Sequence, residues 1–190
     1  MSVEPLLLAY SLSGAAGLRS ALVVLVVAVS AHFGYLHPNP DLAWIGSWGL
    51  IAFACVASVV EFFGDKIPFL DHALHGLHFV LAPVAGAIAA TSGYNGEPAV
   101  DVVLGVLGAG NALLVHSART GVRVASSATT LGTGNVFISF AEDVATVFYM
   151  VVAALAPWLT ALGLILVTYW LVKKLSRLRL LRQASIRAGA

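Results

Sequence analysis

Charged residues are scarce in this chain. Only 10% of its 190 residues are Asp, Glu, Lys or Arg, while 59% are hydrophobic. A soluble domain carries about 25% charged residues, so this composition excludes an ordinary water-soluble globule. A single cysteine, Cys55, excludes a disulfide framework and a thiolate metal cluster, and we expect it to be a small buried apolar residue.

Basic residues are missing from most of the chain and gather at its end. Six of the ten Lys and Arg residues follow position 172, and no acidic residue follows Asp143. A short basic segment directly after an apolar run indicates a cytoplasmic tail that lies against anionic lipid rather than a nucleic-acid-binding segment. Residues 1–30 lack an N-terminal Lys or Arg, and Arg19 interrupts their apolar run, so we interpret them as a retained first span rather than a signal peptide.

Long apolar runs predict an all-α polytopic membrane protein with about six transmembrane helices. A run of about 20 apolar residues is enough to cross the hydrocarbon core of a bilayer. The segment 122–135 is rich in Ser, Thr and Gly, and we expect a loop or a re-entrant, broken segment that lines a cavity. The predicted spans cover about residues 5–31, 42–63, 73–91, 99–118, 136–156 and 157–172.

Six spans would put both termini on one side of the membrane. With the tail inside, the inner segments contain Lys66, Arg119, Arg123 and the six basic residues of the tail, whereas the outer loops contain no Lys or Arg. Because positive charge is enriched in cytoplasmic loops, this distribution predicts that both the N and the C terminus are cytoplasmic.

Two short patterns recur along the chain. The pattern G-x-x-G-x-x-x-A-L-x-V at 14–24 recurs at 105–115, and F-x-x-D at 62–65 recurs at 140–143. Repeats with an odd number of spans are inverted, as in many transporters. The prediction is a first three-helix repeat at 1–97, a second at 98–172 and a basic tail at 173–190. A homodimer or homotrimer is expected, with helix contacts within or between subunits at Gly14, Gly17, Gly105 and Gly108.

The stretch EFFGDKIPFLDHALHGLH at 61–78 places ionisable residues next to apolar runs. Such groups cost about 2.5–3.5 kcal/mol at the centre of a membrane helix, so they need partners or a function. We interpret them as part of an ion or solute pathway, the alternative being structural ion pairing between spans, such as Arg19 with Glu142. The pathway candidates are Arg19, Glu61, Asp65, Lys66, Asn135, Ser139, Glu142 and Asp143, with Arg119, Arg123, Thr130 and Thr133 in the polar loop.

The same stretch contains Asp71, His72, His75 and His78. Spacings of three keep the histidines on one broad helix face, and imidazole with carboxylate suits a divalent transition metal. A divalent metal is therefore one hypothesis for a cofactor, and interfacial or hydrogen-bonding histidines are the alternative.

Several blocks resemble one known family. GLRSALVVL, VEFFGDKIPFLD, PVAGA, HSARTGVR and the pattern N-x-x-x-S-x-x-E-D at 135–143 are similar to a bacterial integral-membrane family known only as a domain of unknown function. The resemblance implies a compact helical protein of the bacterial inner membrane, but it implies no substrate or activity.

These observations favour a small membrane transporter or channel for an ion or small solute, coupled to a proton or cation through buried carboxylates. An intramembrane enzyme that acts on a lipid headgroup, with or without a metal, is the second hypothesis. The third is a non-catalytic membrane scaffold or partner subunit. Membrane lipid is the expected partner in each case. The sequence contains no P-loop, no GxSxG motif, no dinucleotide fingerprint and no zinc-protease motif.

Overall fold

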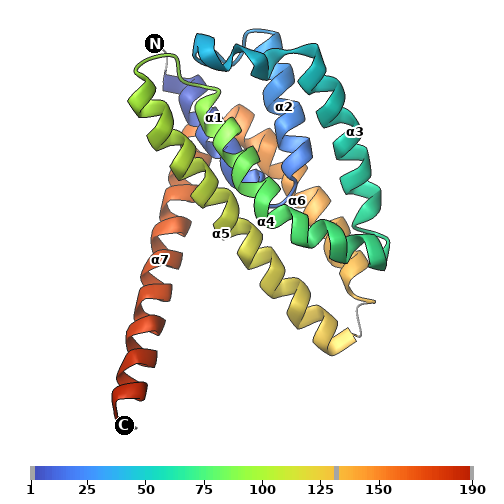
Figure 1. Ribbon diagram of the computed structural model, residues 1–190, viewed down its shortest axis with the longest axis vertical. Helices are drawn as coiled ribbons and strands as arrows, with labels where there is room; N and C mark the ends of the chain where they lie inside the picture. The colour runs from blue at the N-terminus through green and yellow to red at the C-terminus, as the bar shows by residue number, and fades with distance from the viewer. Residues whose placement is uncertain (1–2, 131–132, 189–190) are drawn as a thin grey trace.

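The computed structural model describes residues 3–130 and 133–188, except for the side chains of 68–73, 75, 171–172 and 175–188. The described residues form helices and no strand, which confirms the all-α prediction (Figure 1). In chain order the elements are α1 (Val3–Ala15), α2 (Ser20–His32), the 3₁₀ helix η1 (Pro40–Gly46), α3 (Trp48–Gly64), α4 (Pro68–Thr91), α5 (Pro98–Thr130), α6 (Asn135–Leu155) and α7 (Pro157–Ala188).

Proline marks the start of several elements. It occupies the first position of η1, α4, α5 and α7, at Pro40, Pro68, Pro98 and Pro157. Proline lacks an N–H group, which has no intrahelical partner at a helix start, and its fixed φ suits the first turn. The proline residues therefore set where these helices begin.

α1 and α2 form a hairpin instead of one span. Each helix has 13 residues, about 20 Å, which is too short for a hydrocarbon core of about 30 Å. The start of α1 lies at the end of α4, where Pro5 contacts Gly93. The end of α2 lies at the start of α3, where His32 is 2.8 Å from the carbonyl oxygen of Gly46. The predicted single span at 5–31 is therefore wrong.

A close contact with α5 accompanies the turn of this hairpin. A Cβ atom on Gly17 would lie 2.4 Å from the carbonyl oxygen of Ala112, so only glycine fits there. Arg19 then adopts an extended conformation, with φ −138° and ψ 88°, and α2 begins at the next residue. The tip of the hairpin, residues 16–19, is thus held against the backbone of α5.

The two ends of the bundle differ in charge. The end that holds the start of α1 carries acidic residues at 4, 41, 97 and 101, and we call it the acidic end. The opposite end holds the start of α6 and the far half of α7, and we call it the basic end (Figure 1). The hairpin tip lies inside the bundle, beside Ala112 in the middle of α5. Val3 and Ala188 lie at opposite ends of the bundle, which differs from the predicted arrangement with both termini on one side.

The segment at 122–135 is mostly helical. α5 continues without a break to Thr130, and α6 begins at Asn135. The prediction of a loop or re-entrant segment is therefore wrong for residues 122–130. The basic tail predicted at 173–190 continues the helix α7 as far as Ala188.

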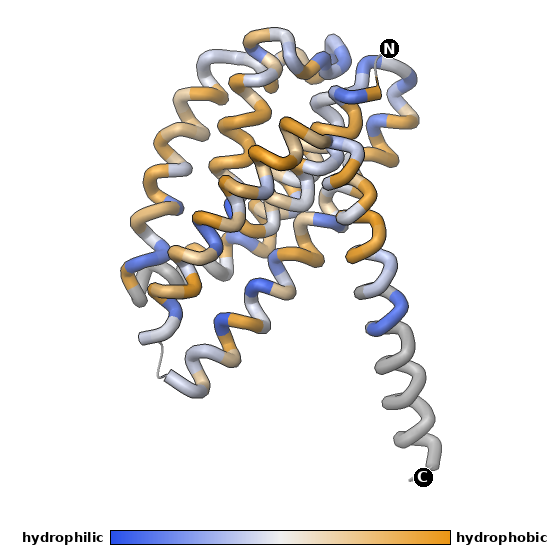
Figure 2. Tube along the Cα trace, turned by 180° about the vertical axis from the view of Figure 1, so that it is seen from behind, coloured by the Kyte–Doolittle hydropathy of each residue, from blue (hydrophilic) through white to orange (hydrophobic). Residues whose placement is uncertain are grey.

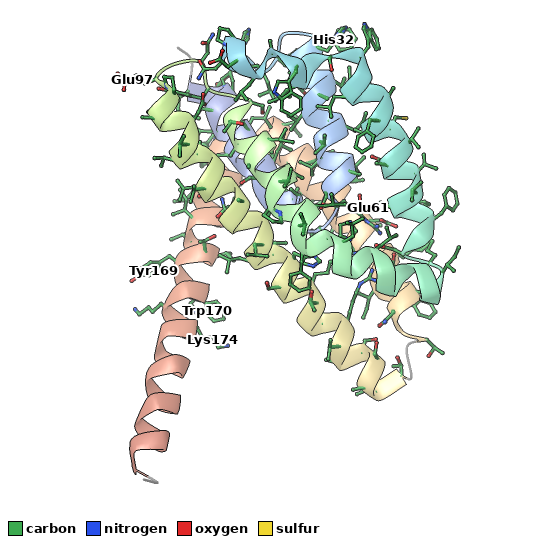
Figure 3. The ribbon with its side chains drawn as sticks, in the orientation of Figure 1. His32, Glu61, Glu97, Tyr169, Trp170 and Lys174 are labelled. Atoms are coloured by element: carbon green, nitrogen blue, oxygen red, sulfur yellow. The ribbon has the colours of Figure 1, made fainter. Side chains whose placement is uncertain are left out.

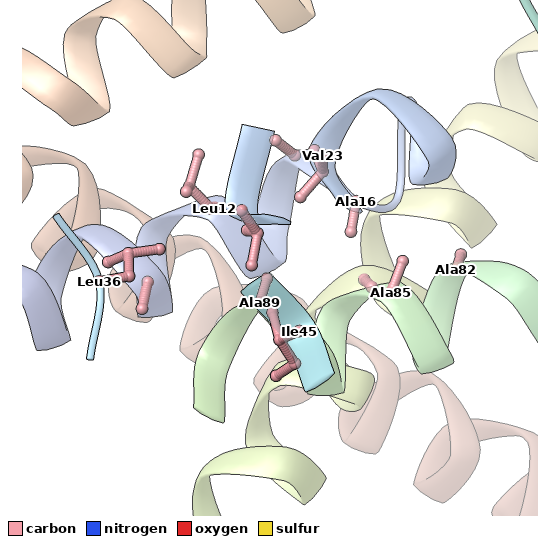
Figure 4. Packing of buried hydrophobic residues seen from close by; sticks show 12 residues of the cluster. Leu12, Ala16, Val23, Leu36, Ile45, Ala82, Ala85 and Ala89 are labelled. Atoms are coloured by element: carbon pink, nitrogen blue, oxygen red, sulfur yellow. The ribbon is translucent and has the colours of Figure 1, made fainter. Parts of the chain in front are cut away.

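Small residues bring the central helices together. α4 and α5 cross where a Cβ on Gly86 would lie 2.3 Å from the carbonyl oxygen of Gly108, so the two backbones touch. Gly14 packs against Leu164 of α7. The described glycine contacts thus lie within the chain. The core beside them is built largely from alanine and small aliphatic side chains from α1, α2 and α4 (Figure 4).

Many large apolar side chains of α3, α5, α6 and α7 are exposed. Figure 2 shows hydrophobic residues distributed along these helices. Two described helices, α5 and α6, are long and apolar enough to cross a membrane, and η1 with α3 would make a third span bent by 48°. The described residues thus have the features of a membrane protein with two or three candidate spans, and the six-span count is not confirmed. Cys55 lies exposed on α3, so the expectation that it is buried is wrong.

Candidate functional site

A buried charge network lies near the basic end of the bundle. Its centre is Asp65, the residue that ends α3. The Oδ2 atom of Asp65 is 2.6 Å from Nη1 of Arg19 and 2.5 Å from Nη2 of Arg119, and Arg123 lies 3.5 Å away. One carboxylate oxygen therefore faces three guanidinium groups, from the hairpin tip and from two successive turns of α5.

α6 contributes the next two carboxylates. Glu142 Oε2 is 2.9 Å from Arg119 Nε and 2.6 Å from Arg123 Nη2. Asp143 pairs with Arg19 and lies 3.0 Å from Lys66 Nζ. The neighbouring acids thus bind different cations, because adjacent helical residues point about 100° apart. The structure does not contain the Arg19–Glu142 pair that structural ion pairing suggested.

Ser139, one turn before Asp143 on α6, completes this side of the network. Its hydroxyl oxygen accepts a hydrogen bond from Arg19 Nη2 at 3.2 Å. Arg19 therefore contacts α3 through Asp65 and α6 through both Ser139 and Asp143. The hairpin tip and α6 are joined by charged and polar groups at this point.

Glu61 also belongs to the network, and it caps the N-terminus of α2. Its two carboxylate oxygens accept hydrogen bonds from the backbone N–H groups of Ser20 at 3.1 Å and Ala21 at 3.0 Å. His78 Nε2 lies 2.8 Å from the same carboxylate. The first N–H groups of a helix have no intrahelical partner, and they carry partial positive charge, so a carboxylate at this place is stabilised. Glu61 lies inside the bundle in Figure 3.

Nearly all of these side chains are buried. The side chains of Asp65 and Arg119 are 2% and 1% exposed, while Lys66 is 20% exposed and marks the edge of the network. Arg19 Nε and Arg119 Nη1 are buried without a hydrogen-bond partner among the described residues. Removing one partner of a buried ion pair costs about 3–5 kcal/mol, because the other charge is left buried and unpaired. We therefore expect the ion pairs of the network to form and break largely together.

The structure brings together most of the predicted pathway residues. The network contains Arg19, Glu61, Asp65, Lys66, Arg119, Arg123, Ser139, Glu142 and Asp143. Arg119 and Arg123 lie on the helix α5 and belong to this network. They do not lie in a polar loop, as the sequence had suggested.

Three predicted residues lie apart from the network and make local bonds at the α5–α6 turn. Thr130 donates to the carbonyl oxygen of Ser126 and accepts from the backbone of Gly134. Thr133 donates to the carbonyl oxygen of Thr130. Asn135 donates to the hydroxyl of Ser127 at 2.9 Å. These bonds hold the turn between the two helices.

The predicted metal group is only partly described. His78 bonds to Glu61, and the side chains of Asp71, His72 and His75 lie outside the described residues. Among the described side chains, no group of three or more His, Cys, Asp or Glu is arranged to hold a metal ion. The pairing of His78 with Glu61 was not predicted, although both residues lie in the stretch 61–78.

A second polar group, the hydroxyl cluster, lies in the bundle closer to the acidic end. Asn111 donates to Ser13 at 3.2 Å and accepts from Thr168 at 3.3 Å. Thr160 donates to Ser11 at 2.9 Å, and Tyr149 donates to the backbone oxygen of the same serine. These bonds join α1 to α5, α6 and α7. The segment Y-S-L-S at 10–13 places two serines within an apolar run and could have indicated this cluster, but it was not among the predicted sites. The cluster comprises Ser11, Ser13, Asn111, Tyr149, Thr160 and Thr168.

The comparison with known families decides what the chain is related to. A family model described as a domain of unknown function, DUF4126, matches residues 6–177. The chain belongs to this family. The match covers both the charge network and the hydroxyl cluster. It confirms the resemblance inferred from blocks such as VEFFGDKIPFLD and the pattern N-x-x-x-S-x-x-E-D at 135–143. No curated protein and no solved structure matches the chain.

Proposed function

We propose that this DUF4126 protein is a small membrane transporter for an ion or small solute, and that the charge network closes its pathway at the basic end. The observation that carries the proposal is the meeting of three carboxylates from distant parts of the sequence. Asp65, Glu142 and Asp143 share the cations of the hairpin tip and α5. Ionisable groups inside a membrane protein commonly mark ion and proton pathways.

The glycine contacts indicate which helices would stay together. Gly86 touches the backbone at Gly108, and Gly17 touches the backbone at Ala112, so the hairpin tip, α4 and α5 pack backbone to backbone. We call these three elements the frame. α6 meets the cations of this frame through Ser139, Glu142 and Asp143. These polar contacts, unlike the glycine contacts, can be switched by charge.

In this proposal a proton or cation that neutralises Glu142 or Asp143 releases α6 from the arginines of the frame. The basic end then opens between α5 and α6. Short helices that end inside the bundle are common in transporters, where helix N-termini hold anionic groups near the site. The α1–α2 hairpin has this form, with Glu61 at the N-terminus of α2. Because this hairpin would leave two crossing helices before residue 97 and three after it, the proposal does not retain the predicted inverted repeats at 1–97 and 98–172.

The proposed orientation follows from charge. Each of the ten Lys and Arg residues falls in the network or on the far half of α7, and the loops at the acidic end contain none. We therefore place the basic end in the cytoplasm of the bacterial inner membrane and the acidic end outside. α1 and α2 enter and return as a hairpin, α3 to α7 cross, and the N-terminus lies outside.

Ion flux tests the function. The protein would be purified, reconstituted in liposomes with a trapped pH dye, and exposed to proton, Na⁺ and K⁺ gradients. We expect flux of at least one ion, and we expect Asp143→Asn and Glu61→Gln to abolish it. Asp41→Asn removes the same charge from an exposed site at the acidic end and should leave flux unchanged. Flux that is unchanged in both network variants would reject the proposal.

Labelling of cysteines tests the orientation separately. In a Cys55→Ala background, Glu4→Cys, Glu97→Cys and Thr133→Cys would be treated in intact spheroplasts with a membrane-impermeant maleimide. The hairpin predicts that positions 4 and 97 react, and that position 133 reacts only after lysis. A straight first span would instead make position 4 behave like position 133.

The lipid-headgroup enzyme receives less support. That hypothesis needs Arg119 and Arg123 to face a groove with free guanidinium groups. Both residues are 4% exposed and both pair with Glu142. Arg119 does line an apolar groove, but we propose that this groove holds an acyl chain and is not a site of headgroup chemistry.

A further inference from the structure

An apolar groove runs between α5, α6 and α7. It consists of two adjoining cavities of about 420 Å³ each, which share Leu18 and Val115 in their walls. Binding sites for small molecules commonly have volumes of about 300–1,000 Å³. One cavity extends along α7 past Gly163 and Val167, and the other lies between α5 and α6 and ends at Arg119 and Glu142.

The walls of this groove suit a hydrocarbon chain. Leu18, Val115, Val122, Ile138 and Leu164 are among the residues that line it. The polar groups present are already engaged, apart from Arg119 Nη1. Tyr149 and Thr160 bond to Ser11, and Arg119 pairs with Glu142. A ligand here would gain burial of apolar surface, about 25 cal/mol per Å², rather than hydrogen bonds.

The α7 side of the groove leads to a basic and aromatic surface. Lys173 Nζ lies 5.7 Å from the ring centroid of Tyr169, and Lys174 Nζ lies 4.8 Å from that of Trp170. Both lysines are exposed, and Figure 3 shows Tyr169, Trp170 and Lys174 on the part of α7 that extends away from the bundle. Aromatic and basic residues together are typical of a membrane–water interface and attract anionic lipid.

The spacing along α7 fits one lipid molecule. Lys173 follows Val167 by six residues, which is about 9 Å along a helix. A phosphate at the two lysines would therefore lie just beyond the groove, and an attached acyl chain would enter it beside Val167 and continue past Gly163.

We propose that this groove binds one acyl chain of an anionic phospholipid, whose phosphate lies at Lys173 and Lys174. The part of the groove along α7 contains no residue of the network, whereas the part between α5 and α6 borders the proposed opening at the Arg119–Glu142 pair. The binding does not depend on the proposed function.

Gly163 offers a clean way to block the groove. It lines the cavity along α7, and a Cβ atom added there meets nothing within 4 Å. Gly163→Leu should therefore fill the groove without straining the helix. Gly110→Leu is the matched control, because Gly110 is also a helical glycine with nothing within 4 Å of an added Cβ, and it lies outside the groove.

The test measures lipid retained by the purified full chain. Native mass spectrometry would count bound phosphatidylglycerol and phosphatidylcholine after equal exposure, with the oligomeric state read from the same spectra. We expect phosphatidylglycerol to be retained about thirtyfold better, since each of the two lysines near a membrane surface contributes about 1 kcal/mol. Gly163→Leu should lose retention of both lipids, and Gly110→Leu should behave like the unmodified chain.

The lysines are tested by Lys173→Gln combined with Lys174→Gln. This variant should lose the preference for phosphatidylglycerol and keep weak retention of both lipids. Equal retention of the two lipids by the unmodified chain would overturn the proposal, and so would unchanged retention in Gly163→Leu. A dimer that Gly163→Leu dissociates would show that a helix of a second copy, and not a lipid, occupies the groove.

Discussion

The charge network and the hydroxyl cluster both place polar groups inside an apolar bundle, but they join helices in different ways. The hydroxyl cluster uses neutral side chains, and its residues Ser11, Ser13 and Thr160 also bond to carbonyl oxygens of their own helices. The network uses full charges, and its members come from the hairpin tip, α3, α5 and α6.

The difference concerns what each region costs to assemble. A hydrogen bond between membrane helices contributes on average about 0.6 kcal/mol. A buried ion pair contributes little net stability compared with apolar residues of similar size, yet loss of one partner costs about 3–5 kcal/mol. This small net contribution to stability supports the proposal that the network has a task besides packing.

The largest effect is expected at the centre of the network. Asp65→Asn leaves three guanidinium groups facing a neutral amide, and we expect the free energy of unfolding in detergent to fall by about 3–5 kcal/mol. The exposed control Asp41→Asn should change it by less than about 0.5 kcal/mol. A loss below about 1 kcal/mol for Asp65→Asn would mean that the network is weakly coupled, like the hydroxyl cluster.

A double-mutant cycle should sharpen the contrast. Arg19 and Asp143 join the frame to α6, so Arg19→Gln and Asp143→Asn should be non-additive. We expect a coupling energy between about 0.5 and 3 kcal/mol in unfolding experiments. Additivity within about 0.3 kcal/mol would show that α6 is held by something other than this pair.

A smaller loss is expected from Asn111→Val in the hydroxyl cluster. The change removes bonds to Ser13 and Thr168 and leaves two small hydroxyl groups that can bond to their own helices. We expect a loss of about 1–2 kcal/mol in the free energy of unfolding. Ion flux should persist, and abolished flux in a folded protein would place the pathway through the hydroxyl cluster instead.

The smallest effect is expected from Thr160→Val, which keeps the side-chain shape and removes one hydroxyl group. The bond to Ser11 should contribute about 0.6 kcal/mol, measured by unfolding in detergent. A loss as large as that of Asp65→Asn would erase the distinction between the two polar regions.

The sequence identified the network residues well because charge in an apolar run is itself a signal. Arg19, Asp65, Glu142 and Asp143 stand out in any reading of composition, and ionisable groups near lipid must find partners. Their pairing was harder to predict, because it depends on the angular offset of Glu142 from Asp143 and on which helices cross. The suggested Arg19–Glu142 pair failed for this reason.

The prediction of a single first span was wrong for a different reason. Residues 5–31 are long and apolar enough to cross a bilayer, and length is the usual criterion. The turn depends on Gly17 meeting the backbone of α5, about a hundred positions later in the chain. Such a contact has no local signal beyond a glycine. In the helical continuation of α5, the hydroxyl groups of Thr129 and Thr130 bond to carbonyl oxygens one turn earlier, so residues that suggested a loop are accommodated in a helix.

The contact between Gly86 and Gly108 has a consequence for measurement. Where two main chains touch, there is no side chain to slide or repack, so α4 and α5 should keep a constant separation in every functional state. Spin labels on these two helices would then give one sharp distance distribution under all conditions. A label on α6 paired with either of them should give two distributions, and their ratio should follow the ion gradient.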